Sequence, residues 1–434
     1  MKLRNLLHLK EDETHLIGSI TPPFFFRVSE IMEEFLRLCD KTSIEEALTV
    51  LKEQNSPEEF ESFQQRLEKI KDKLFVDEEK EKANQIDLSA KVTTLALNVT
   101  RKCNLKCDYC FEDAEWRKFG EMPFSIAQKA IDTFFTDNSS QWVIIFTGGE
   151  PMLNFDLITK VVNYIEQRGV KVEYRIKTNG TLIDDEKIDF LIKNNFKIQI
   201  SLDGNEKAHD THRKFANGKG TFEIVDGLLR KLIEKEYGSK ISISGTLTHQ
   251  TIQYVDDCYA HMNSYSEIKG CTLKSVMTNS HSKYAFTSDD YMFANVSNLN
   301  NNKYLMQQGI KLVEDKKINT VCGIGVWNIT IDIDGMIYPC YRLCGNEKYV
   351  IGNLQLLKLP LKLPKELENL YMLDNNIQCI NCYFINVCKM GCYTDKLMFD
   401  YRISHCFNSK KLIVEEIFCN VFLKKRMYLL LDIV

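Results

Sequence analysis

The sequence predicts an α/β protein whose core is a parallel sheet, and three observations lead to that expectation. Between residues 90 and 310, six strand-like runs alternate with helical runs. Such alternation implies β-α units joined by right-handed crossovers, which form either an open doubly wound sheet or a partial barrel. The chain has 434 residues, too many for one ordinary core at about 150 residues per domain. The segments on either side of residues 90–310 have different patterns, so smaller domains should flank the sheet.

The six strand-like runs are short stretches rich in apolar residues, which is typical of strands buried in a parallel sheet. They cover residues 93–99, 142–146, 172–176, 198–202, 241–247 and 269–276. The helical runs that supply the crossovers cover residues 125–135, 156–167, 184–193, 222–236 and 252–263. In folds of this kind, functional residues gather where the strands end, so the segments after each strand are the first place to look for a site.

Residues 1–85 predict a small winged-helix-like α+β module. Two short apolar runs, at 6–9 and 16–20, flank a polar stretch and indicate a hairpin. Helices should follow. Ser43 with Glu46 forms a capping box before the second one, and Ser56 with Glu59 opens the third. The charged stretch at 77–82 is typical of a linker.

Residues 320–410 predict a domain organised by metal rather than by an apolar core. Hydrophobic periodicity is weak there and cysteines dominate, so the segment should fold around metal ions. Residues 411–434 follow as a C-terminal tail.

Composition narrows the class of protein. The 56 basic and 60 acidic residues give a net charge of −4, which argues against a general nucleic-acid binder. Charged residues interrupt the N-terminus and the apolar C-terminal tail, so neither a signal peptide nor a membrane span is expected. Most of the 15 cysteines stand at short intervals, as metal ligands do. We therefore expect a cytoplasmic protein whose cysteines are thiolates that bind metal.

The first chemical motif is a loop with three cysteines directly after the first strand. Cys103, Cys107 and Cys110 stand within eight residues. Three thiolates in one loop can hold three irons of a [4Fe-4S] cluster and leave the fourth iron open to a ligand. The alternatives are a zinc site or a group of buried thiols. Zinc would need a fourth Cys or His at similar spacing, and none follows nearby.

A second motif follows the second strand, where the chain reads Gly148-Gly149-Glu150-Pro151. Glycines at the end of a strand let a ligand approach the backbone closely. The Glu150 carboxylate adds an acceptor for an ammonium group. By itself a double-glycine turn is most often only a turn, but it is specific when a three-cysteine loop stands one strand earlier.

Together these two motifs resemble those of the radical SAM superfamily, which has a Cys-x3-Cys-x-aromatic-Cys loop and a Gly-Gly-Glu-Pro turn. The resemblance implies a partial (β/α)6 barrel in which the three cysteines hold the cluster. It implies that Tyr109 packs near the adenine of S-adenosylmethionine, whose amino and carboxylate groups bind the open iron. Residues 148–151 would contact the same cofactor.

Later strand ends extend the resemblance. Asn179 follows the third strand, Ser201 the fourth, and Arg213 stands shortly after it. The resemblance assigns Asn179 to the cofactor site, and Ser201 and Arg213 to the ribose and carboxylate of the cofactor. The alternative is that Asn179 and Asp203 are turn residues and Arg213 is a surface charge.

The remaining clustered cysteines resemble the SPASM extension, which binds two auxiliary [4Fe-4S] clusters. Two fully ligated clusters need eight thiolates, and the motif supplies seven. Cys344 could be the eighth, or the first auxiliary cluster is closed from another position or left open to substrate. Zinc knuckles are the alternative for residues 379–392. The seven motif cysteines are Cys322, Cys340, Cys379, Cys382, Cys388, Cys392 and Cys406.

The function that the resemblance implies is radical chemistry on a peptide. Reductive cleavage of S-adenosylmethionine would give a 5′-deoxyadenosyl radical that abstracts hydrogen from a ribosomally made precursor peptide, to install a thioether or carbon-carbon crosslink. Residues 1–85 resemble the leader-binding element of ribosomal-peptide maturases, and a reductase such as flavodoxin or ferredoxin would supply the electron. The sequence identifies no catalytic base.

Two other functions remain open. An anaerobic sulfatase-maturing enzyme would oxidise a residue of a folded partner to formylglycine, but that branch usually carries an acidic residue where this chain has Tyr341. A non-catalytic iron-sulfur electron carrier or zinc scaffold would have no use for the turn at 148–151.

Overall fold

The structure is a computed structural model of the whole chain. It describes residues 2–3, 7–11, 14–20, 23–76, 91–110, 119–136, 141–268, 270–276, 278, 282–287, 289–290, 293–294, 297, 323–357, 361–371, 394 and 397.

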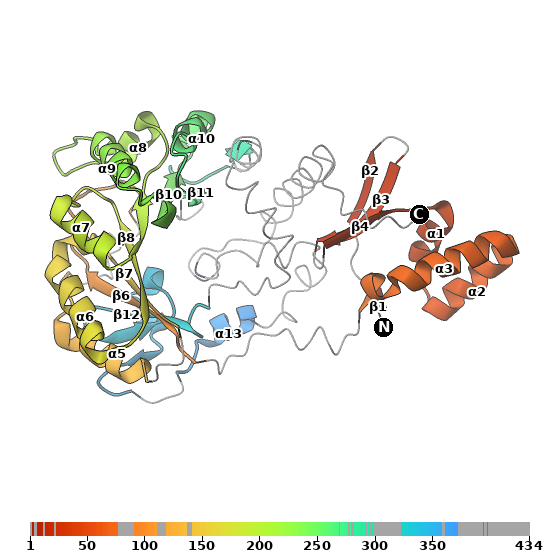
Figure 1. Cartoon of the computed structure of the whole chain (residues 1–434), viewed down its shortest axis with the longest axis horizontal. Coiled ribbons are helices and arrows are strands. Elements are labelled where there is room, and N and C mark those ends of the chain that lie inside the picture. Colours follow the sequence, from red (N-terminus) through yellow and green to blue (C-terminus); the bar gives the residue numbers. More distant parts are fainter. Residues whose placement is uncertain are drawn as a thin grey trace.

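The largest described sheet has nine strands, and the first six of them in the chain are parallel and lie in sequence order (Figure 1). All six strands predicted from the sequence are present, displaced by no more than two residues at either end. Among the described strands, β11 and β14 form the two edges of this sheet, so the sheet is open, as a partial barrel requires. The six strands are β6 (Thr94–Thr100), β7 (Trp142–Gly148), β8 (Val172–Thr178), β9 (Lys197–Ser201), β10 (Ile241–Leu247) and β11 (Gly270–Ser275).

Three further strands extend the sheet beyond β6, and the sequence did not predict them. They come from the segment that was expected to depend on metal, and β12 pairs with β6 in parallel. The next two pair antiparallel. One sheet therefore draws strands from both the β-α region and the cysteine-rich segment. The added strands are β12 (Asn328–Ile331), β13 (Met336–Tyr338) and β14 (Gly352–Asn353).

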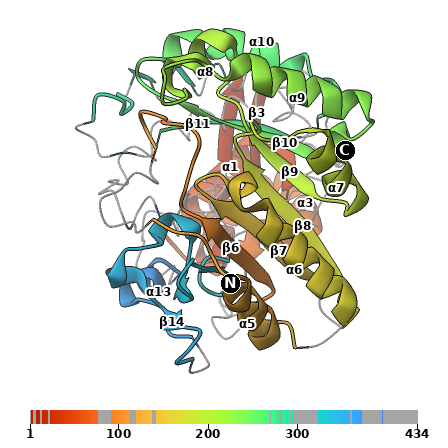
Figure 2. The same ribbon diagram turned by 90° about the vertical axis from the view of Figure 1, so that its left-hand side faces the viewer.

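Helices cover one face of this sheet (Figure 2). Alternate residues of the strands point at them, so that Phe146, Ile176, Ile198 and Ile200 are buried in the main core. The other face carries the polar positions described below. The covering helices are α5 (Phe124–Phe134), α6 (Phe155–Arg168), α7 (Asp185–Lys193), α9 (Phe222–Glu234) and α10 (Val255–Asn263). Helix α8 (Glu206–His212) follows the end of β9, and its buried residues pack outside the main core.

Shorter elements complete the region. Helix α8 and the last helix were not predicted, because runs of seven residues carry too little periodicity. Among the described residues, the 3-10 helices are η2 (Pro151–Asn154), η3 (Gly238–Lys240), η4 (Ile252–Tyr254), η5 (Tyr341–Leu343) and η6 (Glu347–Tyr349), and the last helix is α13 (Lys365–Tyr371).

The N-terminal residues form the predicted hairpin and three helices. Both capping boxes are present: Ser43 accepts from the Glu46 backbone, and Ser56 from that of Glu59. The helices enclose an apolar cluster of their own around Phe35. A third strand and a two-stranded pair of β1 with β5 were not predicted. The elements are β1 (Lys2–Leu3), β2 (Leu7–Glu11), β3 (Thr14–Ile20), β4 (Pro23–Arg27), α1 (Glu30–Cys39), α2 (Ile44–Gln54), α3 (Pro57–Leu74) and β5 (Phe75–Val76).

Within the described residues, no helix has both the length and the apolar character that crossing a bilayer requires.

Candidate active site

The loop with three cysteines begins where β6 ends, at the carboxyl end of the parallel strands. Its middle is held by the segment after α8, since the Lys106 amide donates to the Lys214 carbonyl at 2.8 Å and Leu105 pairs with Phe215. The backbone amide of Leu105 also donates to the sulfur of Cys103, at 3.4 Å. Contacts with neighbouring strand ends therefore fix the path of the loop.

The double-glycine turn lies directly against this loop. The Gly149 amide donates to the Thr100 carbonyl, and the Glu150 amide to the Lys102 carbonyl, both at 2.8 Å. A Cβ atom on Gly148 would lie 2.1 Å from the Thr100 oxygen, and one on Gly149 would lie 2.3 Å from the Lys102 oxygen. Only glycine permits so close an approach of two backbones, which explains both residues in physical terms.

Glu150 joins the ends of β7 and β8. Its carboxylate is fully buried and accepts from the Thr178 hydroxyl at 2.7 Å, the Asn179 amide at 2.7 Å and the Met152 amide at 3.1 Å. Burial raises the pKa of Glu150 to about 7, and the three hydrogen bonds act in the opposite direction. The Glu150 carboxylate therefore accepts from hydrogen-bond donors of the protein itself, rather than from a group in the cavity.

Asn179, after β8, holds the first cysteine. Its side-chain amide donates to the Asn104 side chain at 3.0 Å and lies 3.9 Å from the sulfur of Cys103. Asn104 in turn donates to the Thr181 hydroxyl at 2.8 Å. These contacts connect the cysteine loop to the third parallel strand.

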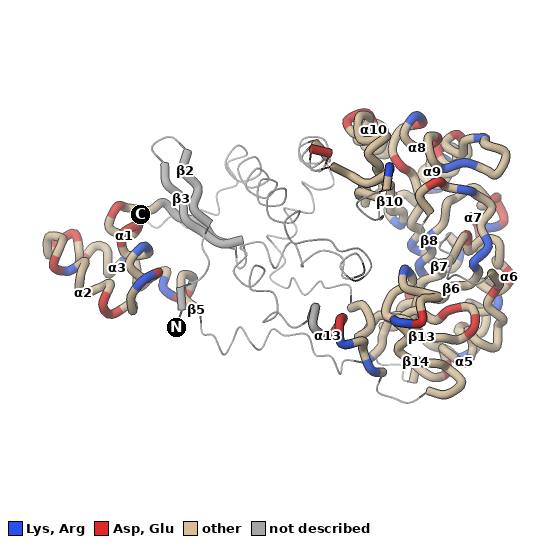
Figure 3. The backbone as a smooth tube through the Cα atoms, turned by 180° about the vertical axis from the view of Figure 1, so that it is seen from behind, with Lys and Arg blue, Asp and Glu red and all other residues tan. Residues whose placement is uncertain are grey.

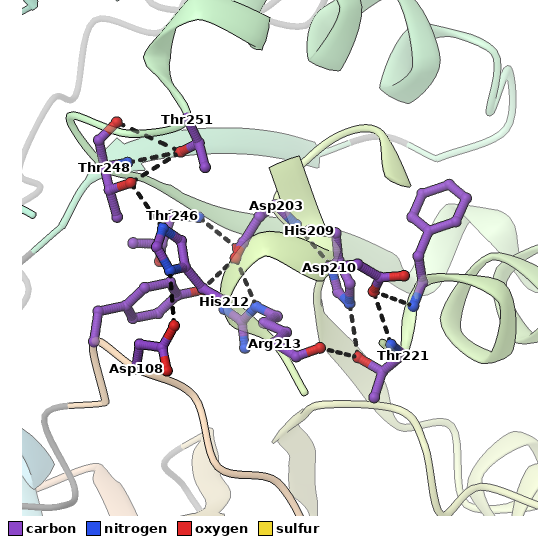
Figure 4. A network of polar contacts seen from close by, with 12 residues as sticks. Asp108, Asp203, His209, Asp210, His212, Arg213, Thr221, Thr246, Thr248 and Thr251 are labelled. Carbon is purple, nitrogen blue, oxygen red and sulfur yellow. Dashed lines mark hydrogen bonds and ion pairs between the residues drawn. The ribbon is translucent and has the colours of Figure 1, made fainter. Parts of the chain in front are cut away.

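Asp203, after β9, connects three segments (Figure 4). Its buried carboxylate accepts from the Arg213 guanidinium at 2.9 Å, the Thr246 amide at 2.7 Å and the Tyr109 hydroxyl. Burial raises the pKa of Tyr109 well above its usual value, so the phenol stays protonated and donates. The sequence offered Asp203 only as a turn residue, and its role depends on contacts that the sequence does not display.

Two buried histidines support this arrangement (Figure 4). His209 accepts from the Asp203 amide at 3.2 Å and contacts the Thr221 hydroxyl at 3.0 Å. Burial lowers the pKa of His209 to about 4, so this ring is neutral. His212 lies between the Thr248 hydroxyl at 2.9 Å and the Asp108 carboxylate at 3.3 Å, and burial lowers its pKa as well. Both imidazoles therefore act as neutral hydrogen-bonding braces.

A cavity of about 520 Å³ opens at these strand ends. The structure brings nine of the sequence-predicted residues together in its wall: Cys103, Cys107, Tyr109, Cys110, Gly148, Gly149, Asn179, Ser201 and Arg213. Glu150 and Pro151 do not line it. Other side chains of the wall were not among the predicted cofactor or metal residues, and they come mainly from β8 to β11 and from the segment after Cys340: Leu105, Lys177, Thr178, Gln199, Ser244, Thr246, Lys274, Ser275, Val276, Tyr341 and Arg342.

Tyr341 brings the C-terminal segment to the cavity. The Lys177 ammonium lies 4.1 Å from the centre of its ring, and the Arg342 guanidinium lies 5.9 Å away. Burial by itself would raise the pKa of Tyr341, but these two cations lower it below its usual value. The aromatic ring thus holds a lysine of β8 at the cavity wall.

The thiols suit a cluster better than a single metal ion. Cys103, Cys107 and Cys110 line one cavity. In a [4Fe-4S] cluster each thiolate binds a different iron, whereas among the described residues no three His, Cys, Asp or Glu side chains surround a single-ion position. Burial raises the pKa of Cys103 to about 11 and that of Cys107 to about 12, so bound metal must displace their protons. The donor set fits a cluster with one open iron.

Of the predicted auxiliary ligands, two lie in the described part of the chain. Cys340 is half-buried, and Cys344 is buried in an apolar cluster with Tyr338, Leu343 and Tyr349. The predictions for Cys322, Cys379, Cys382, Cys388, Cys392 and Cys406 lie outside the described residues.

A buried ion pair, which sequence reasoning missed, ties the start of the cysteine loop to the cysteine-rich segment. Arg101 donates to Asp332 through Nε at 3.1 Å and also through Nη2. Asn98 donates to the same carboxylate at 2.9 Å. The two charged side chains are only 4% and 0% exposed.

Comparison with known proteins agrees with this geometry. Residues 97–261 match the family described as the radical SAM superfamily. The cysteine-type anaerobic sulfatase-maturating enzyme of Clostridium novyi is 25% identical over 328 residues, which are 68% of this chain and 86% of that enzyme. The radical SAM cyclopropyl synthase TigE of Paramaledivibacter caminithermalis is 24% identical over 361 residues, 72% of this chain and 70% of that one.

A solved structure has a similar fold. It is described as native anSMEcpe with bound AdoMet and Kp18Cys peptide, and it matches with a TM-score of 0.59 at 20% sequence identity. The match covers 76% of this chain and 97% of that protein.

Proposed function

Since the chain contains a radical SAM domain and is an enzyme related to sulfatase-maturing and peptide-modifying radical SAM enzymes, we propose that it modifies a ribosomally made precursor peptide. It abstracts hydrogen from that peptide to install a thioether or carbon-carbon crosslink. The observation that carries the proposal is the cavity in which three thiols, a double-glycine turn and the polar ends of four strands meet.

Residues at different strand ends have different roles in this proposal. When bound, a reduced [4Fe-4S] cluster and S-adenosylmethionine supply a 5′-deoxyadenosyl radical. Cys103, Cys107 and Cys110 hold the cluster, and Ser201 and Arg213 orient the cofactor. Asp203 holds Arg213 and Tyr109 in place by hydrogen bonds, so the cofactor side of the cavity is fixed before substrate binds.

We extend the proposal to the electron path. In addition to the cluster at Cys103, the clustered C-terminal cysteines would hold two auxiliary [4Fe-4S] clusters, with Cys344 as the eighth ligand. Such clusters would supply an acceptor for the electron that remains on the oxidised product. A flavodoxin or ferredoxin of the cytoplasm would supply the electron for cofactor cleavage.

The N-terminal module is the proposed leader-binding unit. Its described three-stranded sheet, in the order β2-β3-β4, has β2 and β4 as edge strands. An extended leader peptide can pair with such an edge through backbone hydrogen bonds. This would attach the precursor while its core segment enters the cavity.

Formylglycine formation is the second candidate, because the similarity to the Clostridium novyi enzyme extends over most of both chains. The cavity favours the first candidate. Among the described lining residues none is Asp or Glu, and Tyr341 lines the wall directly after Cys340. A carboxylate base of the kind expected for the sulfatase-maturing branch is therefore not part of the described wall.

The test compares the full-length, anaerobically reconstituted enzyme with the variant in which Cys103, Cys107 and Cys110 are all replaced by alanine. The wild type should form 5′-deoxyadenosine from S-adenosylmethionine, and the variant should form none while keeping its auxiliary iron. Undiminished formation in the variant would sink the assignment.

Mass spectrometry of the product then separates the two candidate functions. Short precursor peptides encoded beside the gene are compared with a cysteine-containing sulfatase peptide. A crosslink removes two hydrogens from the precursor, whereas formylglycine formation removes two hydrogens and exchanges the cysteine sulfur for an oxygen from water, with release of hydrogen sulfide. Product only from the sulfatase peptide would decide for the second candidate.

A further inference from the structure

The cysteine loop has two sides, and one of them faces the cavity. Leu105 lines the cavity and pairs with Phe215 of the segment after α8. Their neighbours in sequence, Lys106 and Lys214, are joined by the hydrogen bond between the Lys106 amide and the Lys214 carbonyl. Because side chains alternate along paired extended segments, Lys106 and Lys214 lie together on the other side, and neither lines the cavity. We call this the outer side of the loop, and define it by these two lysines.

Three lysines on or beside the outer side carry positive charge. Lys106 is exposed, Lys214 is half-buried, and Lys219 is exposed in the turn that follows Phe215. Within the described structure, none of the three ammonium groups has an ion-pair or hydrogen-bond partner. Lys219, like the other two, does not line the cavity. The three charges are therefore directed away from the proposed cofactor site and toward the surroundings of the enzyme.

The carboxylates described around the loop, in contrast, have partners. Glu121 contacts the Lys102 ammonium at 3.0 Å. Asp108 contacts the His212 ring at 3.3 Å. Asp210, close to the turn, accepts from the two backbone amides at the start of α9, at 2.8 and 2.9 Å. The three lysines therefore give the outer side an excess of positive charge.

The helical side of the sheet differs, because cations and carboxylates are interspersed over the covering helices (Figure 3). Every lysine and arginine of α6 and α9 pairs with an aspartate. A group of lysines without such partners is thus a distinguishing feature of the cysteine loop, when it is compared with these helices. The pairs on α6 and α9 are Lys160 with Asp156, Arg168 with Asp132, Arg230 with Asp226, and Lys231 with Asp185.

The position of the outer side suits the entry of an electron. In the proposed function, S-adenosylmethionine and the peptide occupy the cavity, so a donor protein must approach the cluster from another direction. The outer side offers one, since Lys106 directly precedes Cys107 in the chain and consecutive Cα atoms are about 3.8 Å apart. A protein seated on Lys106 and Lys214 is therefore separated from the cluster by the loop alone.

We propose that the outer side of the loop is the docking surface of the electron donor, and that this donor is a small acidic protein whose carboxylates surround its redox centre and contact Lys106, Lys214 and Lys219. The inference rests on the proposed function and says where its partner binds. One electron passes from the donor to the cluster, which goes from its 2+ to its 1+ state, and no bond forms or breaks. Electron-transfer partners meet through small interfaces, and complementary charges speed their encounter.

The test measures anaerobic binding of an oxidised bacterial flavodoxin, chosen for its net negative charge, to the reconstituted full-length enzyme with S-adenosylmethionine present. The affinity should fall about tenfold when the salt concentration rises from about 0.05 M to about 0.5 M, because salt screens the attraction between exposed charges. A basic cytochrome c, a carrier of similar size and opposite charge, should bind about tenfold more weakly than flavodoxin at low salt.

Charge-changing variants then locate the surface. Lys106→Glu and Lys214→Glu should each weaken flavodoxin binding about fivefold, whereas Lys106→Arg and Lys214→Arg keep the charge and should bind as the wild type does. Lys193→Glu is the matched control and should also bind as the wild type does. Lys193 is exposed in the last turn of α7, which precedes β9 and so lies at the edge of the sheet opposite the cysteine loop.

Electron transfer gives a second readout, which needs no turnover of a peptide. In stopped flow, the anionic hydroquinone of flavodoxin loses one electron to the enzyme and becomes the neutral semiquinone, without gaining or losing a proton. At low salt, the second-order rate constant should fall about fivefold for Lys106→Glu and for Lys214→Glu, because charge acts mainly on the rate of encounter. It should be unchanged for Lys193→Glu.

Flavodoxin binding that is unchanged in Lys106→Glu and Lys214→Glu, equal losses in Lys193→Glu, equal losses in the arginine variants, or no binding to the wild type would overturn the inference. A single-stranded oligonucleotide that binds as tightly as flavodoxin, with the same dependence on the two lysines, would also overturn it in favour of a general polyanion surface. Formation of 5′-deoxyadenosine with dithionite, which needs no docking protein, reports separately on the proposed function. A wild-type enzyme that cleaves the cofactor with dithionite, but binds flavodoxin independently of these lysines, fails this inference alone.

Discussion

The loop that carries Cys103, Cys107 and Cys110 is held by a buried ion pair near each end, and the two pairs face different surroundings. At its start, Arg101 pairs with Asp332 after β12, and neither side chain lines the cavity. Near its other end, Tyr109 donates to Asp203, whose partner Arg213 does line the cavity. The exposed fractions of the charged side chains are 4% and 0% for the first pair, and 12% and 1% for the second.

The difference shows that similar chemistry serves two purposes. Two groups of the first pair's network, Arg101 Nη1 and Asn98 Oδ1, are buried and lack a hydrogen-bond partner within the described structure. Because these two groups stay unsatisfied, the network around Arg101 and Asp332 contributes little more than the attachment of the loop to the end of β12. In the second pair, the hydrogen bonds to Asp203 orient Arg213 and Tyr109 toward the cavity. Three predictions test this contrast between attachment and orientation.

The largest effect should come from Asp332→Ala. Removing this carboxylate leaves the Arg101 charge buried without its partner, which costs about 3–5 kcal/mol of unfolding free energy. Urea unfolding followed by circular dichroism measures the loss. The exposed neighbour Asp334→Ala is the control, with an expected cost below about 1 kcal/mol.

A double variant separates charge burial from packing. Arg101→Met combined with Asp332→Leu should recover most of the stability, because apolar pairs of similar volume often replace buried ion pairs without loss. A cost below about 1 kcal/mol for Asp332→Ala would contradict the view that this pair attaches the loop.

Glu150 lies in the double-glycine turn beside the loop, where its amide donates to the Lys102 carbonyl. Its burial leads us to expect that stability depends on pH. Burial raises its pKa from the usual 4.5 to about 7. The folded state therefore holds a proton that the unfolded chain releases. This contribution is fully present below about pH 4.5 and is lost as the pH rises to about 7. At about 1.4 kcal/mol per pKa unit, it amounts to at most about 3 kcal/mol.

Glu150→Gln should remove that part of the pH dependence. Thermal unfolding from pH 4.5 to 7.5 measures it, and Glu166→Gln, at an exposed position of α6, should keep the wild-type slope. If Glu150→Gln and the wild type lose stability in parallel over this range, the buried carboxyl is ionised throughout.

A part of the fold could be predicted from the sequence where neighbouring residues alone show its pattern of apolar positions. The strands β6 and β7 could be predicted because they are nearly continuous apolar runs, such as the one with the fully buried Leu95 and Leu97. The strands β8 to β10 could be predicted because every second residue is buried. Strands β12 to β14 have two to four residues each, too few to show a period. They form because the edge of β6 offers backbone partners, and a sequence does not display this.

In the candidate site too, residues at short spacing could be predicted, and residues joined by long-range contacts could not. Cysteines and glycines at short spacing identified the loop and the turn. The Arg101 to Asp332 pair joins residues 231 positions apart, so no spacing rule could find it. Lys177 was within reach: Glu173, Arg175 and Lys177 alternate with buried residues in β8, which predicts a polar face.

The smallest of the three effects should come from Tyr109→Phe, which removes one hydroxyl from the second pair and leaves its charges intact. A hydrogen bond to a buried carboxylate contributes about 1.5–3 kcal/mol, and the lower value is expected here because Arg213 and the Thr246 amide still satisfy Asp203. Tyr164→Phe is the matched control, since that tyrosine also donates to an aspartate, Asp132 at 2.6 Å, but in an exposed setting where the loss should stay below about 1 kcal/mol. If the second pair serves orientation, Tyr109→Phe should also weaken binding of S-adenosylmethionine, measured by anaerobic equilibrium dialysis, whereas Asp334→Ala and Tyr164→Phe should not. Equal stability losses in the two tyrosine variants, with unchanged cofactor affinity in both, would mean that the far end of the loop is attached in the same way as its start.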